Sequence, residues 1–306
     1  MGIDISVIIA TYNVEPYIER AIQSALDQQG VTLEIIVVDD RSTDKTWEIL
    51  TAKNDLRLRC IRHETNQGPG ATRNTAIAQA NGKWLAILDG DDAFLPDRLE
   101  RCIACANASN ANIVVDNLSV FREEGGATFP MFPSRFSQLN RLDLPTLIKG
   151  KLSWRSSYTL GYLKPIFSAD FLRQNSLMYE TNIPIGEDYL LLAQALAAGA
   201  HCAVEPTAGY LYTARKGSIS YRLSCENITR MLEADAKYLA HYPIAPKAAK
   251  AQKNRERMLK KERAFALLVL AIKQRNPSKI LQAIVSNPPC LLLLWRPLWV
   301  RIKRLI

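Results

Sequence analysis

Carboxylate side chains gather at two turns in the first hundred residues. Asp89-Gly90-Asp91-Asp92 follows an apolar segment, and Gly90 allows the backbone of this turn to come close to a ligand. Asp39 and Asp40 follow another apolar segment. A hard divalent cation, Mg²⁺ or Mn²⁺, takes oxygen ligands of this kind and usually shares them with phosphates. Taken alone, the acidic turn more often caps a helix, and Asp92 fits that role.

A further acidic pair, Glu187-Asp188, lies about a hundred residues later. It stands at the expected start of a helix, where the helix dipole favours carboxylates. Helix capping accounts well for one acidic residue at such a position and less well for two. The pair is therefore a second candidate for chemistry.

The segments around these acids alternate between strand and helix. Short runs rich in β-branched residues predict buried strands, and amphipathic stretches between them predict helices. This pattern predicts an α/β fold with a Rossmann-like, mostly parallel central sheet and helices on both faces. Ligands bind at the carboxyl ends of the strands in such sheets, so we expect the acids to meet there. The expected strands are Ile5–Ala10, Leu33–Val38, Leu56–Cys60, Trp84–Leu88 and Ile113–Val115.

Residues 117–165 lose this alternation, because glycines and prolines interrupt a stretch dense in aromatic residues. A loop that covers a substrate and ordinary packing are both compatible with this composition. Order returns with a helix expected over Leu190–Ala198, which Gly199 closes. Residues 226–306 predict a helical extension, with a basic helix from Lys247 that becomes apolar across Ala264–Ile272.

The charge of the 306-residue chain is uneven. From His241 onward there are 15 Lys and Arg against 2 Asp and Glu, whereas the first 240 residues hold 24 basic and 28 acidic groups. Trp295 and Trp299 lie among basic residues near the end, a mixture typical of a helix in a lipid headgroup layer. We therefore expect contact with an anionic membrane surface through the tail. Packing of the tail on the protein is the alternative, and the apolar run Leu291–Leu294 argues against nucleic acid.

We expect no signal peptide, because no basic start followed by an apolar segment is found, and no apolar run reaches the ~18–20 residues that span a bilayer. Its six cysteines follow no disulfide spacing, and Cys102 and Cys105 are expected to be small buried side chains of a helix rather than zinc ligands. These features favour a cytoplasmic protein, peripheral on the inner face of the cell membrane.

Five segments occur in the order and form that resemble glycosyltransferase family 2. The resemblance covers roughly residues 4–220 and implies an inverting enzyme with the GT-A fold. It implies a catalytic domain over residues 1–225, with a donor half at 1–116 and an acceptor half at 117–225. The matching segments are residues 6–13, 35–44, 66–74, 82–92 and 186–188.

The resemblance also implies roles for individual residues. Asp188, preferred over Glu187, would be the general base that deprotonates the acceptor hydroxyl. Asp91 would be the principal ligand of Mg²⁺ or Mn²⁺, and Asp89 would contact the metal or the ribose. Arg215 or Lys216 would approach the diphosphate from a closing segment. The remaining donor-binding residues would be Ala10, Thr11, Tyr12, Asp40 at the nucleotide base, Arg73 at the nucleotide or its phosphates, and Gly90.

The implied activity is a hexosyltransferase that moves one sugar from a nucleotide-sugar, most often UDP-linked in the family, to a hydroxyl of a saccharide acceptor. The acceptor would be lipid-linked and belong to exopolysaccharide, capsule or lipopolysaccharide synthesis. The Q-x-x-R-W element of processive synthases is absent, which favours single-sugar addition. Arg41 departs from the small residue that the family often has there. A sugar-phosphate nucleotidyltransferase would need a Gly-rich loop after the first strand, and a non-catalytic nucleotide-sugar scaffold would not need Asp91 and Asp188.

Overall fold

The computed structural model describes residues 2–123, 125–150, 158–215 and 224–294. The chain divides into two compact units, Met1–Ser218 and Ile219–Ile306, and each is described by itself. The described residues among the candidate site residues all belong to the first unit. Lys216 and the tail residues Trp295 and Trp299 lie outside the described residues.

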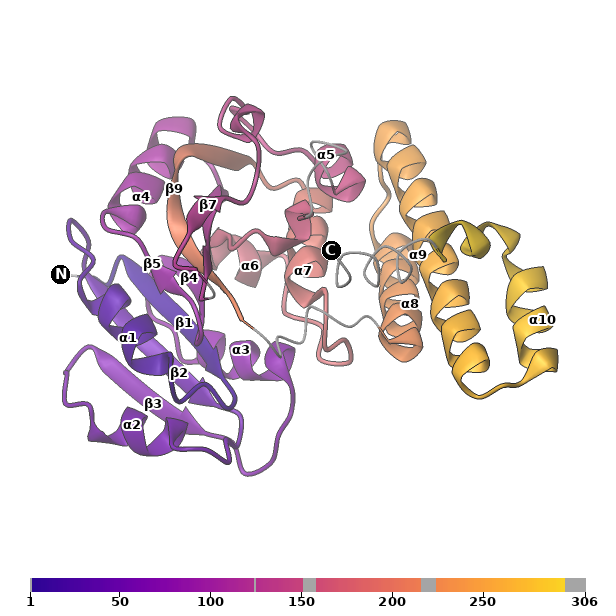
Figure 1. Ribbon diagram of the computed structural model, residues 1–306. Helices are drawn as coiled ribbons and strands as arrows, with labels where there is room; N and C mark the ends of the chain where they lie inside the picture. Colours follow the sequence, from indigo (N-terminus) through magenta and orange to yellow (C-terminus); the bar gives the residue numbers. More distant parts are fainter. Residues whose placement is uncertain (1, 124, 151–157, 216–223, 295–306) are drawn as a thin grey trace. The chain divides into compact units, whose positions relative to one another are not determined.

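Parallel strands form the N-terminal part of the sheet. β1 lies between β2 and β4, and β3 extends the sheet beyond β2. Helices α1 and α2 lie in front of these strands in Figure 1 and α3 behind them, so the predicted α/β sheet with helices on both faces is confirmed. The elements are β1 (Ile5–Thr11), α1 (Ile18–Leu26), β2 (Leu33–Asp39), α2 (Thr46–Ala52), β3 (Leu58–Arg62), α3 (Pro69–Ala78) and β4 (Trp84–Asp89).

Beyond β4 the sheet is mixed. Its order is β3-β2-β1-β4-β8-β6-β9-β5, and β7 pairs with β6 outside this path. β8 runs antiparallel to β4 and β6, whereas β6 and β9 are parallel. The elements are β5 (Ala93–Phe94), α4 (Arg98–Ser109), β6 (Ile113–Arg122), β7 (Thr128–Pro130), α5 (Leu144–Lys149), β8 (Ile166–Ser168), α6 (Ala169–Gln174), α7 (Glu187–Ala197) and β9 (Cys202–Ala214).

The expected strand Ile113–Val115 is too short. β6 continues to Arg122 because β9 pairs with it along its whole length, with one irregularity between Asp116 and Leu118. This partner lies about ninety residues later in the sequence, so local patterning does not reveal the extension. The predicted helix before Gly199 is confirmed as α7, and it begins three residues earlier than expected.

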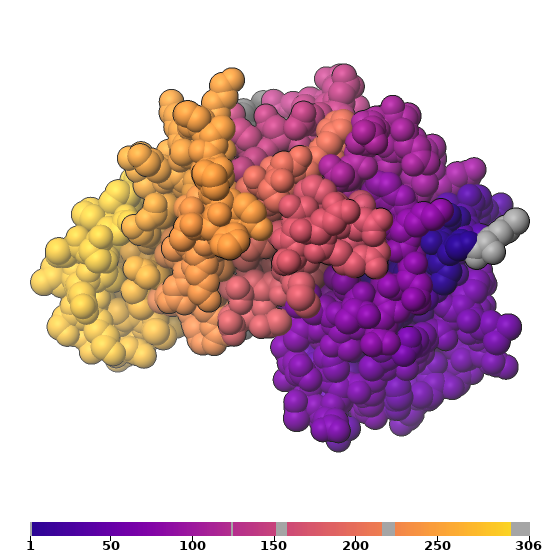
Figure 2. Space-filling model, turned by 180° about the vertical axis from the view of Figure 1, so that it is seen from behind, coloured from indigo at the N-terminus to yellow at the C-terminus, as the bar shows by residue number. Residues whose placement is uncertain are grey.

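Helix α3 is joined to the segment that precedes α7. The Asn74 side chain donates to the Tyr179 carbonyl at 2.9 Å and accepts from the Tyr179 amide at 2.9 Å. Gly70 lies so close that a Cβ atom there would be 2.6 Å from the carbonyl oxygen of Glu180. Seen from behind, the purple surface of the N-terminal residues adjoins the red surface of residues before and within α7 (Figure 2). This junction holds the Glu187-Asp188 pair beside α3.

Arg98 and Asp116 form a fully buried ion pair between α4 and β6. Two guanidinium nitrogens of Arg98 lie 2.9 and 2.8 Å from the two carboxylate oxygens of Asp116. The Arg98 guanidinium also lies 4.7 Å from the ring centre of Phe94 and 5.2 Å from that of Tyr210. Gly209 leaves room for it, because a Cβ there would be 2.5 Å from Cγ of Arg98. Arg98 therefore links α4 to three strands of the second half of the sheet, β5, β6 and β9.

We expect Asp116→Asn to lower the free energy of unfolding by about 3–5 kcal/mol, because it leaves the Arg98 charge buried without a counter-ion. Urea unfolding followed by circular dichroism measures this. The control is Asp170→Asn, which breaks an ion pair with Arg173 whose side chains are 65% and 77% exposed, and should cost less than about 1 kcal/mol. Equal losses for the two variants would contradict this assignment.

The described residues of the second unit form the helices α8 (Cys225–His241), α9 (Pro246–Lys273) and α10 (Pro277–Ser286), followed by a 3₁₀ turn over Pro288–Leu293. The predicted basic helix with an apolar end is confirmed as α9. Ala264, Leu268, Ala283 and Cys290 are buried together and join α9, α10 and the turn. None of the described helices has both the length and the apolar composition needed to cross a membrane.

Candidate functional site

The carboxyl ends of β1, β2 and β4 meet at one edge of the sheet. Thr11 is in register with Asp39, and Ala10 is in register with Asp89. The sheet therefore brings both acidic turns beside the loop after β1, as the alternation of strands and helices predicts. A Cβ on Gly90 would lie only 2.9 Å from Cγ2 of Thr11, so this turn requires glycine to approach the β1 loop.

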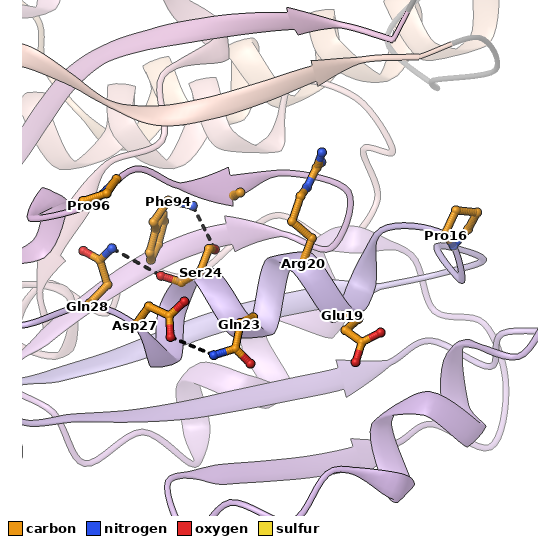
Figure 3. A pocket seen from close by; sticks show the side chains of 10 residues that line it. Pro16, Glu19, Arg20, Gln23, Ser24, Asp27, Gln28, Phe94 and Pro96 are labelled. Carbon is orange, nitrogen blue, oxygen red and sulfur yellow. Dashed lines mark hydrogen bonds between the residues drawn. The ribbon is translucent and has the colours of Figure 1, made fainter. Parts of the chain in front are cut away.

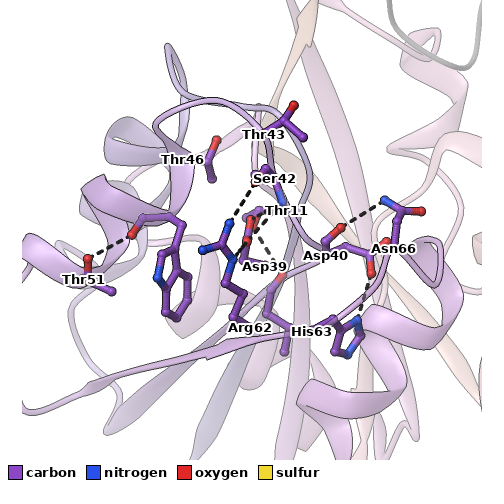
Figure 4. Close-up of polar contacts among 12 residues, drawn as sticks. Thr11, Asp39, Asp40, Ser42, Thr43, Thr46, Thr51, Arg62, His63 and Asn66 are labelled. Atoms are coloured by element: carbon purple, nitrogen blue, oxygen red, sulfur yellow. Dashed lines mark hydrogen bonds and ion pairs between the residues drawn. The ribbon is translucent and has the colours of Figure 1, made fainter.

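Asp39 holds the loop that follows β2 (Figure 4). Its fully buried carboxylate accepts from the backbone amide of Ser42 at 3.2 Å and lies 3.1 Å from Nε of Arg62. The Arg62 guanidinium in turn lies over the Trp47 ring, 5.3 Å from its centre. Both contacts of the Asp39 carboxylate are thus with the protein itself.

Asp40 is also buried, and its two oxygens differ (Figure 4). Oδ1 is hydrogen-bonded to Nδ1 of His63 at 2.8 Å and accepts from the Gln67 amide at 2.8 Å. Oδ2 accepts from the Gly68 amide at 2.8 Å. His63 is further joined through Nε2 to the Thr75 hydroxyl at 3.0 Å. A nucleotide base can therefore use a remaining lone pair of Oδ2, and contact between Asp40 and a base stays a prediction.

The end of β1 and the loop after it contain three of the predicted donor-binding residues, Ala10, Thr11 and Tyr12. Ala10 is half-buried, and Thr11 donates its hydroxyl to the Val38 carbonyl at 3.3 Å. The Tyr12 side chain is 46% exposed, which leaves its ring free to cover a flat ligand. Arg41 has a φ of 66°, in the left-handed region, and its exposed side chain lies outside the bonded cluster around Asp39.

Asp92 does not cap a helix, and the expectation of such a cap is wrong. It is buried, accepting from the Tyr210 hydroxyl at 2.8 Å and from the Thr213 amide at 2.7 Å. Helix α4 begins only at Arg98. Burial, together with the negative charges of Asp91 and Asp89, raises the pKa of Asp92 well above its usual value. Asp92 therefore joins the acidic turn to β9 as a structural residue.

Asp91 is partly exposed and is held from two sides. Its Oδ2 lies 2.7 Å from Nε of Arg215, at the end of β9. Its carbonyl accepts from Nη2 of Arg20 at 2.8 Å, and the same nitrogen donates to the Thr213 hydroxyl at 2.6 Å. The Arg215 guanidinium also lies 5.3 Å from the ring centre of Tyr17. The structure thus brings together Asp91 and Arg215, two predicted donor-site residues from segments 124 residues apart in the sequence.

Two buried cations connect the acidic turn to the start of α7. Arg73 reaches Asp89 at 2.6 Å and Glu187 at 2.7 Å. Lys164 reaches Asp89 at 2.7 Å and Asp188 at 2.6 Å. Burial alone would raise the pKa of Asp89, but Lys164 and Arg73 outweigh it and hold that pKa far below its usual value. Burial, followed by the charge of Asp188, raises the pKa of Glu187.

Sequence reasoning missed Lys164. It lies in residues 117–165, where the alternation of strands and helices is lost. Its partners Asp89 and Asp188 are 75 and 24 residues away, so no sequence motif contains both the lysine and a partner. One local signal was available: Lys164 stands between Leu163 and the apolar run that begins at Ile166. A lone cation in an apolar stretch is rarely buried without a counter-ion, and the search for one leads to the acidic pairs.

The acidic turn fits a hard divalent cation. Carboxylate oxygens of Asp89, Asp91 and Asp92 can lie within 4.8 Å of one another. Asp92 is committed to β9, and both oxygens of Asp89 are engaged by Arg73 and Lys164. Asp91 is 21% exposed and pairs through Oδ2. It is therefore the member of the cluster that fits best as a principal ligand, with Asp89 at its side.

A separate hollow of about 700 Å³ runs along α1 (Figure 3). Its walls carry the acidic side chains of Glu19 and Asp27, the basic side chain of Arg20 and the apolar ring of Phe94. Two of its lining residues are joined by a hydrogen bond, in which the Ser24 hydroxyl accepts from the Phe94 amide at 3.0 Å. Arg20 contributes to the wall but reaches to Asp91 with its tip. The hollow is therefore next to the acidic turn and distinct from it.

Comparisons with known proteins point in one direction. The model of "Glycosyl transferase family 2" matches residues 6–169. The succinoglycan biosynthesis protein ExoO of Rhizobium meliloti is 42% identical over 302 residues, which cover 99% of this chain and 87% of that protein. The succinoglycan biosynthesis protein ExoU of the same organism is 34% identical over 262 residues, which cover 84% of this chain and 75% of that protein.

Solved structures show the same fold. TarS of S. aureus in complex with UDP-GlcNAc has a TM-score of 0.67 and 20% identity, and the match covers 93% of this chain and 91% of that one. The mannosyltransferase PcManGT of Pyrobaculum calidifontis, in complex with GDP-Man and Mn²⁺, has a TM-score of 0.61 and 17% identity, over 99% of this chain and 81% of that one. At these identities the likeness concerns the fold, which is GT-A.

Proposed function

Since this chain belongs to glycosyl transferase family 2, we propose that it moves one sugar from a UDP-hexose to a hydroxyl of a saccharide acceptor, with inversion at the anomeric carbon. The observation that carries this proposal is the direct linkage of Asp89 to Asp188 through Lys164. This linkage supports a single site in which the acidic turn binds the diphosphate and Asp188 acts as the base. The succinoglycan relatives support polysaccharide synthesis as the setting.

Each group has a task in this reaction. Asp188 accepts the proton of the acceptor hydroxyl, whose oxygen attacks the anomeric carbon from the face opposite the leaving diphosphate. The bond from that carbon to the diphosphate oxygen breaks, and its electron pair leaves with the diphosphate. Arg215 lies beside Asp91 and can stabilise the negative charge that develops on the diphosphate. Mg²⁺ or Mn²⁺, held by Asp91 and Asp89, would supply Lewis-acid stabilisation of the same charge.

A panel of nucleotide-sugars tests the proposal. Thermal shift with and without Mn²⁺ identifies the donor, and transfer to lipid-linked saccharides is followed by chromatography. Proton NMR of the product then reports the anomeric configuration. A non-catalytic scaffold would bind the donor without transfer or hydrolysis. Retention of configuration would contradict the role of Asp188 as a base.

Arg215→Ala is expected to lower kcat/KM about 10–100-fold, because a hydrogen bond to a charged group contributes about 1.5–3 kcal/mol. Steady-state kinetics with the identified donor measures the loss. The matched control is Arg173→Ala, which removes an exposed arginine from α6 and should leave kinetics unchanged. Unchanged donor affinity and turnover in Arg215→Ala would remove Arg215 from the donor site.

We propose that the enzyme acts at the inner face of the cell membrane, where it would reach a lipid-linked acceptor and its basic tail would contact anionic lipid. Leu281, Val285 and Leu292 are all more than 60% exposed in the second unit, which supports contact with lipid. Cys290 and Leu293 are instead buried, so a deletion that spares the core begins after Leu294. Removing residues 295–306 should reduce co-sedimentation with vesicles that contain phosphatidylglycerol. Unchanged binding would favour packing of the tail on the protein.

A further inference from the structure

Lys164 joins the two acidic parts of the site through one atom. Its Nζ lies 2.7 Å from Oδ2 of Asp89 and 2.6 Å from Oδ2 of Asp188. The side chain is 7% exposed. A buried ammonium is tolerated only when charged partners surround it, so the two carboxylates and the lysine hold one another in place.

The lysine is itself fixed by the fold. Its carbonyl oxygen accepts from Nη2 of Arg98 at 2.7 Å, and Arg98 is held by Asp116. Two residues later the chain enters β8, which lies between β4 and β6 in the sheet. The ammonium therefore projects from a rigid part of the backbone, and it can set the position of a side chain that it binds.

The two carboxylate oxygens of Asp188 differ in their hydrogen bonding. Oδ2 is bound by Lys164, whereas Oδ1 is buried and accepts no hydrogen bond from the described residues. The cation closest to Oδ1 in the described network is Arg73, at 3.6 Å, and its Nη1 already binds Glu187 at 2.7 Å. A buried anionic oxygen without a donor is unfavourable unless a ligand supplies one. An acceptor hydroxyl is such a donor.

We propose that Lys164 is a positioning residue for the transfer: by holding Oδ2 of Asp188 it presents Oδ1 as the atom that receives the proton of the acceptor hydroxyl. This inference rests on the proposed glycosyl transfer. The O–H bond of the acceptor breaks toward Oδ1, and the electron pair of its oxygen forms the new bond to the anomeric carbon. The bond between the anomeric carbon and the diphosphate oxygen breaks, and its electron pair leaves with the diphosphate. Lys164 remains charged throughout.

A competing role for Lys164 is that of a counter-ion for Asp89 alone. The two roles differ in what a variant loses. A counter-ion for Asp89 would support donor binding, so that its removal weakens UDP affinity. A positioning residue for Asp188 acts through the base, so that its removal lowers kcat and has no further effect once the base is gone.

A double-mutant cycle separates these roles. Lys164→Met, Asp188→Asn and the double variant are made in the full chain, with Lys83→Met as control, since Lys83 is 72% exposed on its side chain. We expect Lys164→Met to lower kcat at least about 10-fold, with the Kd for UDP and Mn²⁺ within about threefold of the native protein. In the Asp188→Asn background the same substitution should change kcat by less than about twofold.

Three outcomes bear on this inference. Losses that multiply in the double variant, or a loss confined to the Kd for UDP, would overturn it while the native enzyme still transfers sugar. A native protein that binds UDP but transfers no sugar from any donor would remove the proposed function and this inference together. If Lys164→Met does not fold, Lys164→Arg takes its place in the cycle. Lys164→Arg keeps the charge but displaces the contact with Asp188, so it should still lower kcat while the Kd for UDP is unchanged. A Lys164→Arg variant with native kcat and lost UDP affinity would contradict the inference.

Discussion

Asp188→Asn is expected to lower kcat about 10²–10⁴-fold, the usual contribution of general-base catalysis. Asparagine has the size of aspartate but cannot accept the acceptor's proton. Its amide oxygen can still accept from Lys164, so the network between the acidic turn and α7 is retained in outline. The Kd for UDP in the presence of Mn²⁺ should therefore stay within about threefold of the native value.

The comparison with Glu187→Gln decides which acid is the base. Glu187 is bound through Oε1 by Arg73, whereas Asp188 has an oxygen without a hydrogen bond among the described residues. Initial rates of UDP release in the presence of acceptor measure both variants, with Asp170→Asn as an exposed control. A larger loss of kcat in Glu187→Gln than in Asp188→Asn would exchange their roles. Native turnover in Asp188→Asn would remove the base assignment altogether.

The donor half could be predicted well because its information is local. β1, β2 and β4 are continuous runs of buried, largely β-branched or aliphatic residues, and such runs are typical of parallel strands covered on both faces. Parallel strands that alternate with helices place their carboxyl ends on one edge. The neighbourhood of Thr11, Asp39 and Asp89 follows from that rule alone.

The second half could not be predicted in the same way because its partners are remote. β9 was not expected, although nine of the ten residues of β6 pair with it. Asp92 looked like a helix cap since α4 follows it, but its partners Tyr210 and Thr213 lie about 120 residues further on. Lys164 belongs to no sequence motif that would indicate a role. In each case a long-range contact, rather than local propensity, decides the role.

Asp40 shows a different limit. Its position after β2 and its match to the family both suggest contact with a nucleotide base. The sequence does not show that His63 and the amides of Gln67 and Gly68 already occupy much of its carboxylate. Whether Asp40 touches the base or orients the loop that does so depends on these contacts. These contacts arise from the tertiary structure, so the local sequence around Asp40 does not reveal them.

Asp91→Asn is expected to weaken the activation of turnover by Mn²⁺ more than about 100-fold, since even outer-shell changes around a metal typically cost 10–100-fold in affinity. Asp91 is partly exposed and, unlike Asp89, is not paired through both carboxylate oxygens with buried cations, so its loss removes the best ligand. The matched control is Asp92→Asn in the same turn. Burial raises the pKa of Asp92 and so favours its neutral form, and a neutral amide there should change Mn²⁺ activation less than about threefold.

Turnover measured across a Mn²⁺ titration, after treatment with EDTA, compares the two variants directly. The control should instead show reduced thermal stability, because an amide cannot reproduce both hydrogen bonds, from Tyr210 and from Thr213, with the same geometry. Equal loss of Mn²⁺ activation in both variants would mean that the turn acts as a unit and that Asp91 is not the principal ligand. A native enzyme that keeps full turnover in EDTA would assign stabilisation of the diphosphate to the chain's own cations. In that case Arg215, which already binds Asp91, is the described residue that we expect to carry this role.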